Sequence, residues 1–187
     1  MGPVGDFQLM RCRRLFLLSV LILSAAHLVP AQKEKRQPLT EAEVEKIREA
    51  GIFPDERITL YTKFMDDHAE TIKGLTNRRQ SVARGKRIDD ELLDLTALMD
   101  ELGSNLDQYA ERKADIRGGL KKLNEAAPRW VSILHALAGE PSFDEARKEA
   151  IEAGEDLADE AKRLLAEQTD YFATHKDEKG QERAEPK

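Results

Sequence analysis

Apolar residues recur with helical spacing through the middle of the chain. Fifteen positions between residues 88 and 137 step forward by four and three residues in alternation, and only Lys113 among them is polar. The other fourteen are Ile88, Leu92, Leu95, Met99, Leu102, Leu106, Tyr109, Ile116, Leu120, Leu123, Ala127, Trp130, Leu134 and Leu137. One narrow stripe along about 50 helical residues, roughly 75 Å at 1.5 Å per residue, needs partner helices to cover it. The pattern predicts a helical bundle or coiled coil.

The central stripe contains three residues that weaken a helix. Gly118 and Gly119 each cost about 1 kcal/mol of helix propensity, and Pro128 removes one backbone hydrogen bond. The apolar spacing nevertheless keeps its phase across all three residues. We therefore expect one long, kinked helix, with a break near Gly118 or Pro128 as the alternative.

Helices are also predicted on the N-terminal side of the stripe. Thr40 and Glu43 match a capping box, and Gly51 suits a left-handed C-terminal cap, so a helix of about ten residues is expected between them. Pro54 suits the first turn of a second helix, which we expect to run to about residue 84 and to close at Gly85. The link of residues 85–87 is so short that it predicts an antiparallel hairpin.

The C-terminal part of the chain predicts one more long helix and a tail. Ser142 and Glu145 match a second capping box, and apolar or small residues recur at helical spacing from there to about His175. Residues 176–187 carry no large apolar side chain and read as a disordered charged tail. The fold class expected for residues 39–175 is an all-α, elongated antiparallel bundle of three long helices plus a short N-terminal one. A break in the central helix would give four.

The first 31 residues have the features of an export signal. Arg11, Arg13 and Arg14 precede an apolar run at residues 15–26, and Ala31 ends a small-residue cleavage site before a polar linker at residues 32–38. Residues 13–17 resemble the twin-arginine export motif, and general secretion is the alternative. Both interpretations predict a periplasmic or secreted protein without a transmembrane span after cleavage.

Charge and cysteine content narrow the classes of function. The chain has a net charge of −6, and loss of the signal would leave 27 basic and 35 acidic side chains, a net charge of −8. An acidic chain is a poor general binder of nucleic acid, which draws affinity from basic surface. The one cysteine, Cys12, lies within the signal, so the exported chain is expected to have no disulfide.

No motif of a catalytic site is recognisable. The sequence has no GxSxG, P-loop, HExxH or CxxCH, and no cofactor is predicted. The weak metal candidates are His68, Asp67 and Glu70, which lie close together on the second helix and would need ligands from another helix. The competing interpretation, which we favour, is a hydrogen-bonded histidine beside solvated carboxylates.

A basic cluster at the predicted hairpin tip is the other candidate site. Five cations, Arg78, Arg79, Arg84, Lys86 and Arg87, fall within ten residues that contain no acid. They could bind an anionic surface or an acidic partner. Alternatively they only complement the helix dipole at the end of the second helix.

These observations predict an exported, non-enzymatic scaffold or binding protein of the cell envelope or periplasm. Expected partners are another envelope protein or an anionic surface, and a homodimer is a further alternative because apolar stripes often pair with copies of themselves. Residues 39–49 resemble the Leu-Thr-initiated helix of small periplasmic stress chaperones, a likeness of eleven residues that identifies no family. It implies a chaperone-like or adaptor function with an apolar groove as an alternative. A metal-binding or small-ligand-binding bundle that uses His68 is another.

Overall fold

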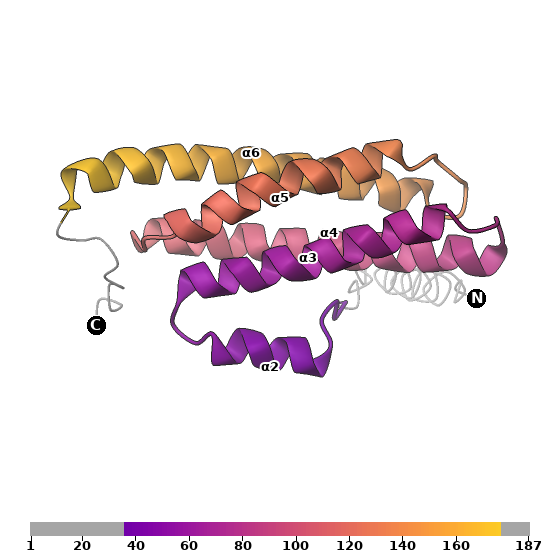
Figure 1. Cartoon of the computed structure of the whole chain (residues 1–187), viewed down its shortest axis with the longest axis horizontal. Coiled ribbons are helices and arrows are strands. Elements are labelled where there is room, and N and C mark those ends of the chain that lie inside the picture. The colour runs from indigo at the N-terminus through magenta and orange to yellow at the C-terminus, as the bar shows by residue number, and fades with distance from the viewer. Residues whose placement is uncertain (1–35, 177–187) are drawn as a thin grey trace, which may run out of the picture. The chain divides into compact units, whose positions relative to one another are not determined.

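The computed structural model describes residues 36–176, which fold into α-helices joined by short turns (Figure 1). The helices are α2 (Glu41–Glu49), α3 (Pro54–Thr76), α4 (Val82–Glu111), α5 (Arg117–Ala136) and α6 (Asp144–Thr174). No strand occurs between residues 36 and 176, and the predicted all-α bundle is confirmed. The predicted export signal and all but the first residue of the predicted tail lie outside the described residues.

Helices α3 to α6 form a bundle of two antiparallel hairpins, α3–α4 and α5–α6. Each helix also packs against one helix of the other hairpin, α3 on α5 and α4 on α6, whereas the diagonal pairs do not touch. Between hairpins the neighbours run parallel, since Asp55 and Asp66 of α3 bond to Gly119 and Arg129 of α5 in the same order. The chain therefore crosses the bundle diagonally on its way from α4 to α5.

The apolar stripe forms the core. All fourteen of its apolar side chains are at most 5% exposed, and they meet buried residues of α3 and α6 such as Ile58, Met65 and Leu164. The large rings of Trp130 and Phe64 are also buried, at 1% and 2% exposure. Side chains of all four long helices thus fill the interior.

The expected single central helix is wrong: the stripe is divided between α4 and α5. Helix α4 ends at a Schellman motif in which the Lys113 N–H bonds to Ala110 O at 3.1 Å and the Ala114 N–H bonds to Tyr109 O at 3.0 Å. Lys113 has a φ of 56°, the left-handed conformation usually occupied by glycine. The one polar residue of the stripe therefore marks the break. The phase continues across it because each helix buries a stripe of its own.

Gln168 of α6 closes the turn between α4 and α5. Its amide nitrogen donates to Ala114 O at 2.8 Å, and its amide oxygen accepts from the Ile116 N–H at 3.0 Å. The Gln168 side chain is buried, and the contact spans more than 50 residues of sequence. One side chain thus satisfies two backbone groups that the break would otherwise leave unpaired inside the protein.

The alternative expectation, a break near Gly118 that gives four long helices, is confirmed, although the break lies at residues 112–116 and both Gly118 and Pro128 lie within α5. Asp55 of α3 caps the N-terminus of α5, because its Oδ1 accepts from the Gly119 N–H at 2.8 Å. A Cβ on Gly118 would lie 2.3 Å from Asp55 Oδ2, and one on Gly119 would lie 2.9 Å from Ile58 Cβ. These glycines allow α3 to approach α5 closely, so their role is in packing. Pro128 stays inside the helix without ending it.

The second predicted helix is also shorter than expected, since α3 ends at Thr76 and not near residue 84. Residues 77–81 form the turn, and the Ser81 hydroxyl caps α4 by accepting from the Arg84 N–H at 3.2 Å. Gly85 lies inside α4, where a Cβ would be 2.6 Å from Ser142 Oγ. That glycine permits a close approach to the α5–α6 turn and does not end a helix.

Of the two predicted capping boxes, the first is confirmed. Thr40 accepts from the Glu43 N–H at 3.3 Å, the Glu43 carboxylate accepts from the Thr40 N–H at 2.8 Å, and Gly51 has a φ of 56°. The box at Ser142 is wrong, because α6 begins one residue after Phe143, which occupies the N-cap position without a side-chain cap. Burial of the Phe143 ring, 2% exposed, anchors this end instead.

Candidate docking surface

The α3–α4 turn presents cations that have no acidic partner. Arg78 and Arg79 lie in the turn, Arg87 lies in the second turn of α4, and all three are exposed. None of them forms an ion pair or a side-chain hydrogen bond with another residue of the described range 36–176. Most cations on the long helices are paired with a carboxylate nearby, as Lys63 is with Asp67 at 2.7 Å. These three arginines therefore keep their charge available at the surface.

Arg84, which the sequence placed in the same cluster, is buried and belongs to the interior of this end. Its Nε donates to Leu75 O at 2.9 Å, and its Nη1 donates to Glu140 Oε1 at 2.7 Å. The side chain is 8% exposed. Arg84 thus joins the end of α3 to the α5–α6 turn and neutralises Glu140, so it holds the tip in place and is not available to a partner.

Val82 adds an apolar group to the basic surface. It is 91% exposed at the first position of α4. Because α4 buries Arg84, Gly85 and Ile88, the opposite face of its first turns carries Val82 together with Lys86, one helical turn later. The polar run at residues 76–81 and the cap at Ser81 are the signals that could have placed this boundary correctly.

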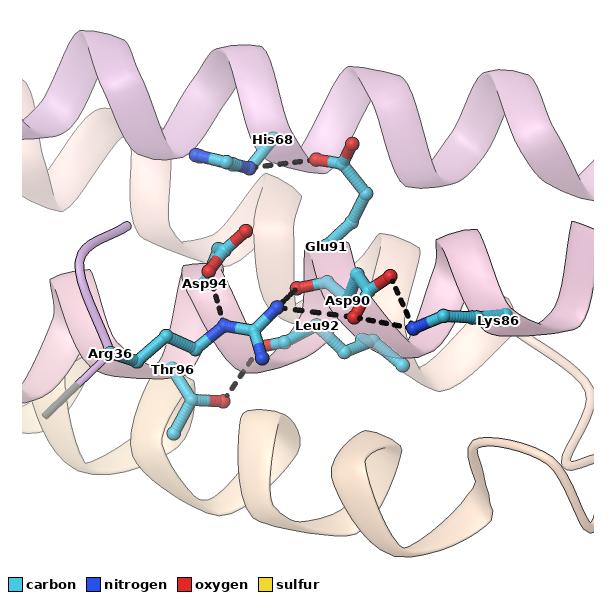
Figure 2. Close-up of polar contacts among 8 residues, drawn as sticks. All are labelled: Arg36, His68, Lys86, Asp90, Glu91, Leu92, Asp94 and Thr96. Carbon is cyan, nitrogen blue, oxygen red and sulfur yellow. Dashed lines mark hydrogen bonds and ion pairs between the residues drawn. The ribbon is translucent and has the colours of Figure 1, made fainter. Parts of the chain in front are cut away.

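Lys86 belongs to a small ion network on α4 (Figure 2). Its Nζ lies 3.1 Å from Asp90 Oδ2, and Arg36 binds the same carboxylate at 3.3 Å and also bonds to Asp94. The hydrogen bond from Lys86, with a contribution from Arg36, lowers the pKa of Asp90. Lys86 remains 72% exposed in its side chain, and Asp90 is shared between two cations. Asp90 therefore neutralises little of the positive charge of the tip.

The weak metal candidates are not brought together. His68 Nδ1 lies 2.8 Å from Glu91 Oε2 across the α3–α4 interface (Figure 2), whereas Asp67 and Glu70 form ion pairs with lysines of their own helix. Within residues 36–176 no group of three or more His, Cys, Asp or Glu side chains has an arrangement that could hold a metal ion. The observed geometry is that of a hydrogen-bonded histidine between helices.

Two open grooves lie elsewhere on the described surface. The first, of about 530 Å³, lies between α4 and α6 and has an acidic lining that includes Asp100, Asp107 and Asp156. The second, of about 680 Å³, lies where α2, α3 and α5 meet, beside Asp55 and Gly118. Neither groove contains a buried polar side chain that lacks a partner and points into it.

Comparison of the chain with protein-family models, with curated proteins and with solved structures gave no match. Among the helices described, none is both long enough and apolar enough to cross a membrane.

Proposed function

We propose that this protein is an exported, non-enzymatic helical scaffold or binding protein of the cell envelope or periplasm. The observation that carries the proposal is the unpaired basic tip, formed by Arg78, Arg79 and Arg87, on a chain whose net charge is −6. A filled interior leaves the surface as the place where this protein meets other molecules. Within residues 36–176 the tip is a basic part of that surface, with a charge opposite to the net charge of the chain.

The partner of this tip would be anionic. Cations concentrated at one end attract negative groups and orient the protein during encounter, while the acidic remainder of the chain repels them. Arg84 and Glu140 hold the tip, so it would bind without first becoming ordered.

The test is crosslinking in the native cell envelope, followed by identification of what is recovered with the tagged protein. In one variant Arg78, Arg79 and Arg87 are replaced by glutamine. In the matched control Lys46, Lys121 and Lys176 are replaced by glutamine; these are also exposed, and their charge change is the same. We expect the tip variant to lose its partner and the control to keep it. Equal recovery from both variants would contradict the proposal.

A second candidate function, an adaptor or chaperone-like protein, is favoured by a different surface. Val44, Ile52 and Phe53, which lie on α2 and in the α2–α3 turn, are 42%, 68% and 58% exposed. Exposed apolar side chains of this kind are typical of surfaces that bind other proteins. Binding of a hydrophobic dye that disappears in the double variant Ile52→Ser and Phe53→Ser would support this function, and dye binding unchanged by the substitutions would argue against it.

A further inference from the structure

We propose that the α3–α4 tip docks onto the surface of an anionic lipid bilayer. The inference rests on the proposed function and names the partner of the same surface. Its determinants are the guanidinium groups of Arg78, Arg79 and Arg87, the ammonium group of Lys86 and the side chain of Val82.

The charge pattern fits a plane of negative headgroups. Residues 77–88 contain no acid, and two of the carboxylates beside the tip are already paired, Glu140 with Arg84 and Asp90 with Lys86 and Arg36, which leaves Asp89 as the adjacent acid. Each Lys or Arg beside an anionic membrane increases partitioning by about fivefold. The three unpaired arginines together would then contribute roughly 100-fold.

Val82 distinguishes a bilayer from other anionic partners. An apolar side chain that is 91% exposed, in a segment whose charged side chains are all basic, matches an interface in which headgroups lie beside the hydrocarbon region. A polyanionic chain would use the cations and leave Val82 in water. Insertion of Val82 removes apolar surface from water, which we expect to increase partitioning by roughly fivefold.

The internal contacts of the tip fix which face of α4 points outward. Gly85 lets α4 approach Ser142, and Arg84 fastens the end of α3 to Glu140, so the buried face of the first turns of α4 is fixed against the α5–α6 turn. The opposite face, with Val82 and Lys86, therefore points outward. No conformational change is needed for it to meet a surface.

The experiment is co-sedimentation of the chain from residue 32 to 187 with lipid vesicles. This chain contains every buried residue of the core, lacks the apolar run at residues 15–26, and its folding is checked by circular dichroism. Vesicles of phosphatidylcholine alone are compared with vesicles that contain phosphatidylglycerol, at low and high salt. We expect binding only to the anionic vesicles, weakened by salt because mobile ions screen exposed charges.

The two triple glutamine variants test whether the tip is the surface that binds the vesicles. Replacement of Arg78, Arg79 and Arg87 by glutamine should reduce partitioning by roughly 100-fold, whereas the control triple at Lys46, Lys121 and Lys176 should change it little. Equal losses in the two triples would mean that only net charge matters and would overturn the inference.

Insertion is read from a tryptophan placed at the tip. The native Trp130 is 1% exposed, so a second tryptophan from Val82→Trp reports its own surroundings. Its emission should shift to the blue with anionic vesicles, whereas that of the control Val44→Trp should not. No vesicle binding, or no shift at position 82, would overturn the docking proposal. If crosslinking in the envelope still depended on the tip, the lipid would be the wrong partner and the proposed function would stand.

Discussion

The α4–α5 turn and the α3–α4 turn use buried polar side chains in different ways. At residues 112–116, Gln168 is buried and both of its amide atoms bond to backbone groups of the turn. Beside the α3–α4 turn at residues 77–81, Arg84 is likewise buried and bonded to a backbone carbonyl, but Arg78 and Arg79 of the turn remain exposed and unpaired within the described chain. In the α4–α5 turn the buried side chain satisfies backbone groups of the turn. The α3–α4 turn has a hydrogen-bonded interior as well, but its outer surface carries unpaired charge, which is the difference expected between a structural turn and a binding surface.

The largest effect on stability should come from removing the Gln168 side chain at the α4–α5 turn. Gln168→Ala leaves the Ile116 N–H and the Ala114 C=O without their partner in a buried place, and we expect the free energy of unfolding to fall by about 3 kcal/mol. Urea denaturation measures this change. Gln168→Glu keeps an acceptor for the Ile116 N–H but sets a buried carboxylate oxygen against Ala114 O, so at neutral pH it should also be strongly destabilising, whereas Glu167→Ala, next to it on the exposed side of α6, should lose less than either. A loss at Gln168 no greater than that at Glu167 would contradict the comparison.

At the α3–α4 turn, replacement of the buried Arg84 should lower the free energy of unfolding by less. Arg84→Met removes the ion pair with Glu140, but Glu140 is 23% exposed and can be hydrated, and Leu75 O still accepts from the Arg78 N–H at 3.1 Å. We expect a loss of about 1.5 kcal/mol in the free energy of unfolding. The triple replacement of Arg78, Arg79 and Arg87 by glutamine should leave stability almost unchanged. A triple variant as unstable as Arg84→Met would show that these arginines have a structural role.

The two turns also show how far the sequence predicts this fold. The 3.5-residue spacing identified fourteen residues of the core because burial of an apolar stripe is a local pattern, and the first capping box was found for the same reason. The break at Lys113 was missed because the groups that stabilise it come from Gln168, more than 50 residues away. Gly85 was interpreted as a helix end and Gly118 as an alternative break point, since a sequence does not show that Asp55 and Ser142 pack against them.

The candidate site was predicted in part. Four of the five cations of the cluster are exposed at the tip, whereas Arg84 is not, because its carbonyl partner lies at the end of α3 and its carboxylate partner lies in the α5–α6 turn. Charge density along the chain is visible in the sequence, but whether a given cation has a partner depends on tertiary contacts. Arg36, which the sequence placed in a linker, was missed as a partner of Asp90 for this reason.

A third prediction tests the cap that Asp55 supplies to α5. Gly118→Ala places a Cβ against Asp55 Oδ2, so the cap is displaced and the gain in helix propensity is offset. In the Asp55→Ala background the cap is already absent, and the same substitution should stabilise the protein. Thermal or urea unfolding of both singles and the double variant should give a coupling free energy of about 1 kcal/mol. The control Gly103→Ala, whose Cβ would meet no atom within 4 Å, should be additive with Asp55→Ala.

The smallest effect concerns the network beside the tip, where Lys86 and Arg36 hold the pKa of Asp90 below its usual value. Because the folded protein favours the ionised carboxylate, the network stabilises the fold above the ordinary pKa of aspartate and loses this contribution as the pH falls through the lowered value. Asp90 is 42% exposed, so the contribution is a small fraction of the total stability. NMR titration of the Asp90 carboxyl should show its pKa rising in Lys86→Gln and, by less, in Arg36→Gln, whereas Lys121→Gln should not change it. An Asp90 pKa that is the same in all three variants would mean that the ion network of the tip is not formed in solution, and Lys86 would then be as free as Arg87 to meet an anionic partner.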